Sequence, residues 1–139
     1  LILEDDVKIP NNFNSKLNNI LDNLPPKWDI IFLGGCNIKG EKYNEHFIIP
    51  TRNKYLYNLC MHSYLVNNRS CKKIIDLLTP LSRPIDTQLR SKFKDLNVYY
   101  ANPTIILQNK DIRSTRRDLD GIPQSKYWKV NHDKIQITD

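Results

Sequence analysis

The sequence has few cysteines and no long apolar run, and each shortage argues against a class of protein. Its three cysteines, Cys36, Cys60 and Cys71, form no CxxC pair and leave one over. This favours free thiols in a reducing compartment over a disulfide framework. A cytoplasmic location is therefore favoured, although the sequence does not identify the compartment. No apolar run approaches the ~20 residues that cross a bilayer, and no signal peptide is visible in the sequence. We therefore expect neither a membrane span nor a disulfide scaffold.

The composition fits one folded domain. The chain has 139 residues, of which 40% are hydrophobic and 26% charged, values near the average for globular proteins. The net charge of +6 favours phosphate-bearing partners, although a solvated lysine-rich surface gives the same number. The basic stretch 113–117 is interleaved with Asp111, Asp118 and Asp120, which makes it a poor nucleic-acid footprint. No nucleic-acid partner is expected.

The first third of the chain predicts a strand, a helix and a second strand. Residues 1–7 form an apolar run that ends in acids, which is typical of a buried strand whose carboxyl end reaches a site. Residues 13–24 show helical spacing behind Asn12 or Asn14 as a cap. Residues 28–33 form another buried strand, followed by Gly34 and Gly35. This order predicts a parallel α/β unit.

Further elements are expected along the rest of the chain. We expect a long loop over 36–54 with a short strand at 46–49, strands at 59–66, 98–100 and 104–107, and helices from Ser70 to Pro80 and from Pro84 through Phe93. After residue 112 the sequence turns polar and basic, which predicts a partly flexible tail over 113–139.

The acidic triplet Glu4-Asp5-Asp6 is the strongest chemical signal in the sequence. Divalent cations such as Mg²⁺ and Mn²⁺ prefer oxygen ligands, and in phosphate chemistry one or two carboxylates commonly hold them. If the strand continues through the triplet, Glu4 and Asp6 point to one side and Asp5 to the other. The plain alternative is a solvated turn at the strand end.

Two other protein classes use paired acids in this way. A response-regulator receiver needs a phosphate-accepting Asp at the end of a later strand, but the strand at 28–33 ends in Gly34-Gly35, so a receiver is rejected. A metal-dependent nuclease would use paired carboxylates and a basic surface. The weak basic footprint argues against the nuclease.

Five segments together are similar to the glycosyltransferases of family 25, which include lipooligosaccharide galactosyltransferases and collagen hydroxylysine galactosyltransferases. The segments are 3–7, 28–34, 62–66, 84–86 with Leu89, and 102–103 with Gln108 and 111–112. Their order and spacing match those of the family. Cys60-Met61 stand where the family tends to have Gly-Thr.

The resemblance implies a GT-A-like (Rossmann-like) α/β fold with a mixed sheet flanked by helices, in which residues 1–112 form the C-terminal part of the catalytic domain. It also implies Mn²⁺ or Mg²⁺, a UDP-sugar donor carrying galactose or glucose, a glycan or hydroxylysine acceptor, and inversion at the anomeric carbon. In such enzymes much of the nucleotide pocket precedes the acidic motif. The fold is therefore expected to be incomplete on its N-terminal side and completed by a preceding segment or a partner chain.

The metal ligands that we expect are Glu4 and Asp6, with Asp111 completing the shell. A metal held there would neutralise the charge that develops on the leaving diphosphate. For Asp111 the alternative is a loop carboxylate paired with Arg113.

The expected catalytic residues are Asp86 and His62. Asp86 follows Pro84 at a helix start and could act as the base or grip the acceptor, or could only interact with the helix dipole. His62 could contact a sugar or phosphate, or be a buried structural residue. Gly34 and Gly35 could admit the donor close to the backbone, or only make a tight turn.

Two functions from different classes remain open. The first is a metal-dependent inverting hexosyltransferase, for which a chain of this length can be too short to act alone. The second is an inactive remnant of such an enzyme that binds carbohydrate or protein.

Overall fold

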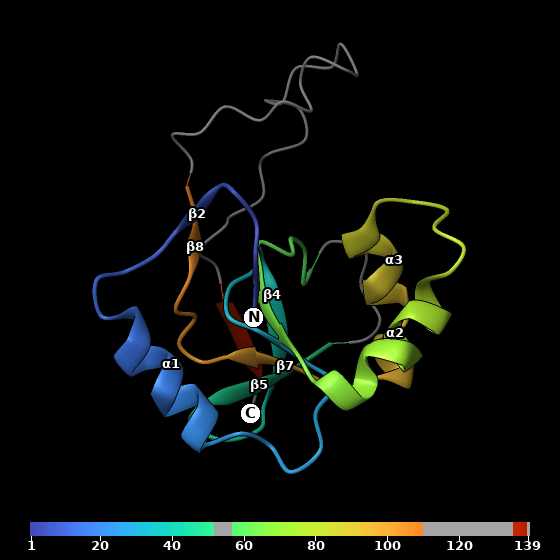
Figure 1. Cartoon of the computed structure of the whole chain (residues 1–139). Coiled ribbons are helices and arrows are strands. Elements are labelled where there is room, and N and C mark those ends of the chain that lie inside the picture. Colours follow the sequence, from blue (N-terminus) through green and yellow to red (C-terminus); the bar gives the residue numbers. More distant parts are fainter. Residues whose placement is uncertain (52–56, 110–134, 139) are drawn as a thin grey trace.

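The computed structural model describes residues 1–51, 57–109 and 135–138, and its central feature is a mixed seven-stranded sheet with helices on both sides (Figure 1). The strands lie in the order β1 (Ile2–Leu3), β6 (Ser63–Val66), β3 (Ile30–Phe32), β7 (Val98–Ala101), β5 (Phe47–Pro50), β4 (Ile38–Lys42) and β9 (Ile135–Thr138). A second, two-stranded sheet joins β2 (Val7–Lys8) to β8 (Leu107–Gln108). The predicted α/β class with a mixed sheet is confirmed.

Strand β3 lies in the middle of the core because both of its faces are covered. Its side chains alternate, so Ile30 and Phe32 face one hydrophobic cluster while Ile31 and the following Leu33 face another. Helices α2 (Cys71–Leu78) and α3 (Ile85–Ser91) cover the first face, and α1 (Phe13–Asp22) covers the second (Figure 1). This explains why residues 30–33 read as a continuous apolar run.

The predicted parallel unit is only partly right. Strands β1 and β3 run in the same direction, but β6 lies between them and is antiparallel to both. In the described sheet β1 is an edge strand, and Leu1 and Ile2 are 56% and 45% exposed. The expectation of one buried strand over 1–7 is wrong, because the backbone turns at Asp5 and Asp6 before β2 begins.

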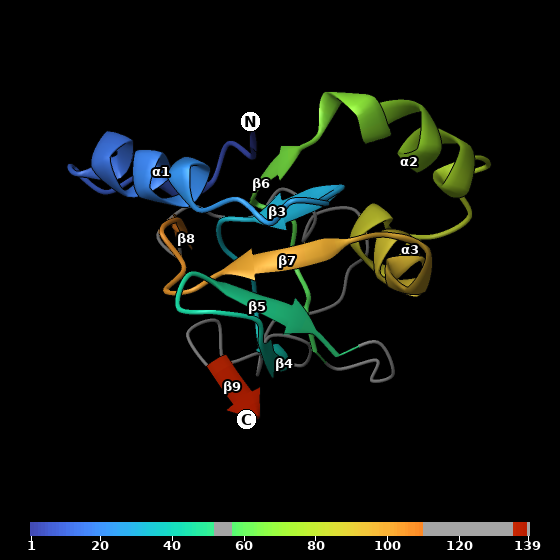
Figure 2. The ribbon, with the colours of Figure 1, turned by 90° about the horizontal axis from the view of Figure 1, so that it is seen from below.

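Strand β4 was not expected, since residues 36–54 show no regular period. It forms an antiparallel pair with β5, and Figure 2 shows β5 beside β7 in the same sheet. Gly40 permits the close approach, because a Cβ there would overlap the carbonyl oxygen of Ile49. Pairing with a neighbouring strand, rather than local propensity, makes this segment a strand.

The three helices were predicted, with corrections at their ends. Ser70 occupies the cap position of α2 without a capping bond, because it lies in the 3₁₀ turn η1 (Asn68–Ser70) and its hydroxyl donates to Asp29 instead. Phe93 belongs to the separate 3₁₀ turn η2 (Phe93–Asp95), beyond the end of α3. The strand expected at 59–66 begins only at Ser63.

The cysteines correct the prediction of a chain without disulfides. Cys36 and Cys60 form a disulfide with Cα atoms 5.5 Å apart, and Cys71 is free. An isolated bridge between Cys36 and Leu59 brings the two segments together. Closing a loop of this length is worth about 3 kcal/mol in the chain-entropy model. The predicted cytoplasmic location rested on the expected absence of disulfides, and the Cys36–Cys60 disulfide contradicts that basis.

One further strand completes the large sheet. Strand β9 comes from the segment expected to be a tail and pairs in parallel with β4. Across the described ranges, no helix is both long and apolar enough to span a bilayer.

Candidate functional site

The candidate site lies at one end of the large sheet, where β1 and β3 end and β6 begins. The Glu4 N–H donates to the carbonyl oxygen of His62 at 2.9 Å, and the Leu33 N–H donates to that of Ser63 at 3.0 Å. Because β6 runs against both neighbours, its first residues meet the last residues of β1 and β3. Three segments predicted to carry the site are thereby brought to one edge.

His62 and Gly34 form a tightly packed pair at this edge. His62 is 2% exposed, and its Nε2 lies 3.4 Å from the carbonyl oxygen of Ile106. A Cβ at position 34 would overlap both Nε2 and that carbonyl oxygen. Only glycine at position 34 allows His62 and Ile106 to approach in this way.

Gly35 has a similar role toward a different side chain. A Cβ there would come within 2.6 Å of the Tyr100 ring, which stacks on Phe32 with ring centroids 4.7 Å apart. On the side where a Cβ would stand, both glycines therefore face protein atoms. Donor binding by Gly34 and Gly35 stays a prediction.

Asp6 is held by the neighbouring two-stranded sheet. Gln108 Nε2 donates to Asp6 Oδ2 at 2.6 Å, and the Asn109 N–H donates to the Asp6 carbonyl oxygen at 2.6 Å. The other carboxylate oxygen, Asp6 Oδ1, is buried and has no hydrogen-bond partner in the described part of the chain, and the same holds for Gln108 Oε1. Two touching side chains thus each have one buried oxygen acceptor that the described residues leave without a hydrogen bond.

Carboxylates gather around Glu4. Burial raises the pKa of Glu4, and the charges of Asp6, Asp5 and Asp86 raise it further. The side chain of Tyr64 responds to the same field, because burial and the charge of Glu4 raise its pKa. Helix α3 therefore brings Asp86 into the electrostatic environment of the acidic triplet.

Asp86 accepts hydrogen bonds from its neighbour in sequence and acts electrostatically on a buried tyrosine. Its Oδ1 accepts hydrogen bonds from the Thr87 N–H at 2.7 Å and from Thr87 Oγ1 at 3.2 Å. Burial raises the pKa of Tyr100; the charge of Arg90 opposes this and that of Asp86 adds to it. The Tyr100 hydroxyl is buried without a hydrogen-bond partner among the residues described.

Most of the predicted site residues therefore lie near one another. Glu4 and His62 share a backbone hydrogen bond, His62 packs on Gly34, and Asp86 acts electrostatically on Glu4. Asp111 lies outside the described residues, so its proposed place in the metal shell stays a prediction. The contribution of Gln108 to holding Asp6 was not anticipated, because a contact across 102 positions of sequence leaves no local pattern.

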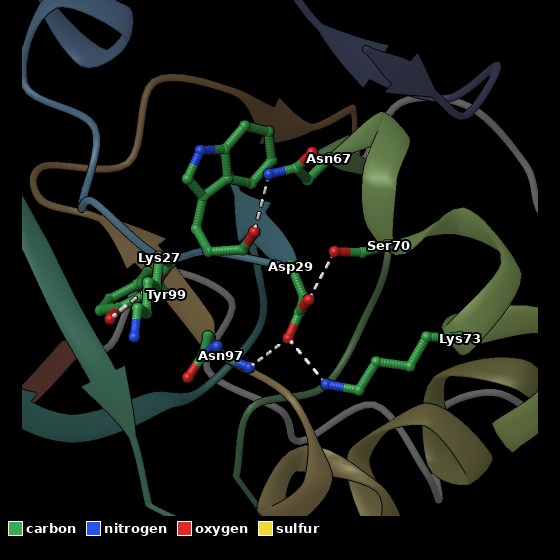
Figure 3. Close-up of polar contacts among 8 residues, drawn as sticks. Lys27, Asp29, Asn67, Ser70, Lys73, Asn97 and Tyr99 are labelled. Carbon is green, nitrogen blue, oxygen red and sulfur yellow. Dashed lines mark hydrogen bonds and ion pairs between the residues drawn. The ribbon is translucent and has the colours of Figure 1, made fainter.

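A second buried acid, Asp29, lies at the other end of β3 and has a different environment (Figure 3). Its Oδ1 accepts from the Ser70 hydroxyl, and its Oδ2 accepts from the Asn97 N–H at 2.7 Å and from Lys73 Nζ at 3.3 Å. Burial raises its pKa, but the bonds from Ser70, Asn97 and Lys73 outweigh burial and lower it overall. Asp29 therefore links the start of β3 to the start of α2 and to the segment before β7.

Comparisons with models of protein families, with curated proteins and with solved structures found no match to this chain. The resemblance to family 25 glycosyltransferases therefore continues to rest on the segments of the sequence that carry it.

Proposed function

We propose that this chain is a GT-A-like catalytic region of a metal-dependent inverting hexosyltransferase similar to family 25. The observation that carries the proposal is the gathering of acids at one sheet edge. Glu4 lies at the surface among other carboxylates, and its pKa is raised by desolvation and by the charges of three of them. Such mutual repulsion is relieved when a divalent cation binds. Asp6 Oδ1, buried and without a partner in the described residues, supplies an oxygen ligand.

The acids at this edge would have separate roles in a transfer reaction. Glu4 and Asp6 would hold Mn²⁺ or Mg²⁺, which when bound stabilises the charge of a departing UDP diphosphate. Asp86 would accept the proton of the acceptor hydroxyl, since it is half-buried and lies in the same electrostatic environment as Glu4. The acceptor would be a glycan or a hydroxylysine side chain.

His62 would position the metal ligand rather than touch the proton that moves. Its ring is almost fully buried against Ile106, while its carbonyl oxygen accepts the Glu4 N–H at 2.9 Å. The packing of His62 on Gly34 thus sets where the backbone of Glu4 lies. A residue of this kind affects the metal site through geometry.

Donor hydrolysis in the presence of Mn²⁺ tests the proposal. The protein is incubated with UDP-galactose or UDP-glucose, and release of UDP is compared among wild type, Asp6→Ala and the control Asp76→Asn. Asp76 is an exposed acid on α2 paired with Lys72, so its loss should leave turnover unchanged. Asp6→Ala should reduce turnover by roughly 10²–10³-fold, the usual effect of removing one group that stabilises developing charge.

The second candidate is a non-catalytic module that binds carbohydrate or protein. It is favoured by the filling of the space beside Gly34 and Gly35 with His62, Ile106 and Tyr100. In the same assay, wild-type protein that binds Mn²⁺ but releases no UDP from either donor would contradict the transferase and support this module.

A further inference from the structure

Cys36, Cys60 and His62 form a cluster that the proposed transfer reaction does not use in full. One ligand atom from each, the two Sγ atoms and a ring nitrogen, lie within 4.8 Å of one another. Cys36 follows the glycine pair after β3, whereas Cys60 and His62 lead into β6. The isolated bridge between Cys36 and Leu59 holds these segments together, so the cluster does not depend on the disulfide alone.

We propose that this cluster is a redox-controlled binding site for a thiophilic divalent cation such as Zn²⁺. In the oxidised chain Cys36 and Cys60 form the disulfide. A dithiol reductant donates two electrons, the S–S bond breaks, two thiols form, and the reductant becomes a disulfide. The cation then binds both thiolates and the His62 ring and displaces two protons from the thiols. The fourth position of a tetrahedral shell remains for water.

The charge balance suits a buried location. Two thiolates cancel the charge of Zn²⁺, and a neutral imidazole adds none, so the loaded site is neutral. Burying an uncompensated ion would be costly. Cys36 and His62 are buried while Cys60 is half-buried, so water and the cation can reach the site from the Cys60 side.

The imidazole is already oriented by the protein. Nε2 lies 3.4 Å from the Ile106 carbonyl oxygen, which accepts only from a protonated nitrogen. Histidines that bind metals commonly donate their other N–H to a backbone carbonyl in this way. In the tautomer in which Nε2 donates to this carbonyl oxygen, the lone pair on Nδ1 is the one left for the cation.

The backbone at Cys60 supports a role for its sulfur. Cys60 has a φ of 67°, in the left-handed region that residues with a Cβ seldom occupy. Strained residues of this kind persist where the surroundings hold them, and they gather at functional sites. Glycine would adopt this backbone conformation without strain, but the residue here is a cysteine, which supplies a sulfur atom.

This site differs in chemistry from the acidic edge. Sulfur and imidazole ligands select zinc-like ions, whereas the carboxylates of Glu4 and Asp6 select Mg²⁺ or Mn²⁺. The cluster therefore does not depend on the proposed transferase function, and its test can fail or succeed separately.

Cobalt binding provides the test, because Co²⁺ replaces Zn²⁺ and reports its ligands by absorption. The full chain is reduced with a phosphine under anaerobic conditions, freed of reductant and titrated with Co²⁺. We expect one equivalent to bind with the intense visible bands of a four-coordinate ion and a thiolate charge-transfer band. Zn²⁺ should bleach both. The oxidised chain should show neither.

Variants assign the ligands. Cys36→Ser and Cys60→Ser should remove the charge-transfer signature, and His62→Gln should weaken Co²⁺ binding at least about tenfold. Cys71→Ser is the matched thiol control and should match wild type, as should Asp76→Asn, which removes an exposed acid outside both sites. Circular dichroism checks that each variant is folded. If Cys36→Ser unfolds, the spectrum of Cys60→Ser, at a half-buried position, tests the sulfur ligands instead.

Three outcomes would overturn the proposal. They are a reduced wild type without thiolate-to-cobalt absorption, a signature that persists in Cys60→Ser, and a signature lost in Cys71→Ser. As a second measurement, Zn²⁺ should protect two of the three thiols of the reduced chain from alkylation. If all three thiols were alkylated equally with and without Zn²⁺, the Cys36–Cys60 pair would form a disulfide but no zinc site.

Discussion

Asp29, which is buried, and Glu4, which is exposed, are two acids at opposite ends of one sheet, and their surroundings are opposite in kind. Asp29 precedes β3 and accepts hydrogen bonds from Ser70, Asn97 and Lys73 (Figure 3). Glu4 follows β1 and is surrounded by other carboxylates. Burial acts to raise both pKa values, yet that of Asp29 is lowered overall and that of Glu4 is raised.

The difference separates a structural acid from a candidate ligand. A carboxylate that the fold supplies with donors is satisfied without any external group, and its charge stabilises the elements that it joins. A carboxylate that the fold places beside like charges is destabilised as an ion until a cation arrives. The free energy of unfolding should therefore respond in opposite directions when each charge is removed.

The largest effect is expected at Asp29. Asp29→Ala leaves the Ser70 hydroxyl and the Asn97 N–H without their acceptor, and each unsatisfied donor costs about 1–3 kcal/mol. We expect the free energy of unfolding to fall by roughly 2–6 kcal/mol when these two costs combine. Urea unfolding followed by circular dichroism measures the change.

Lys73→Ala is the control for the charge of the partner. The Lys73 side chain is 48% exposed and that of Asp29 is 9% exposed, so this ion pair is largely screened and should be worth less than about 1 kcal/mol. A loss in Lys73→Ala as large as that in Asp29→Ala would show that the ion pair, rather than the two hydrogen bonds, holds the junction.

An intermediate effect is expected from a cation at the acidic edge. Mn²⁺ at a hundredfold excess over its dissociation constant should raise the free energy of unfolding by about 2.7 kcal/mol, since it binds only the folded state. Thermal unfolding with increasing Mn²⁺ measures this. Asp6→Ala should lose the stabilisation, whereas Lys73→Ala should keep it. Equal stabilisation of wild type and Asp6→Ala would place the cation elsewhere.

The smallest effect is expected from Glu4→Gln without metal. Because the pKa of Glu4 is raised above 4.5 in the folded chain, its ionisation costs stability at neutral pH, and this cost disappears as the pH falls below 4.5. Glu4→Gln should therefore be more stable than wild type at pH 7, by about 0.5 kcal/mol, and equal to it in acid.

Asp29 should behave in the opposite sense over a lower pH range. Its pKa is lowered from 3.8, so its contribution is complete above pH 3.8 and is lost as the pH falls through the folded value. Unfolding measured from pH 7 downward compares wild type, Glu4→Gln and Asp29→Ala. A Glu4→Gln variant that is less stable than wild type at pH 7 would contradict the proposed repulsion.

The local sequence pattern was sufficient to predict the elements whose buried positions recur at regular intervals. The run at 30–33 is apolar because both faces of β3 are covered, and α3 begins after Pro84 as expected. The position of the acids after the first strand was also predictable. Strand β4 was not, because its alternation is interrupted by Gly40 and becomes regular only through pairing with β5.

The sequence by itself determined the α/β class, the three helices and the placement of acids after a strand, since these depend on side-chain periodicity over short stretches. Tertiary structure alone decided that β6 lies between β1 and β3, that Cys36 pairs with Cys60, and that Gln108 holds Asp6. It also decided that Asp29 accepts hydrogen bonds from nearby donors, whereas Glu4 lies near other carboxylates. Each of these depends on contacts between distant residues, whose partners are selected by strand register and core packing.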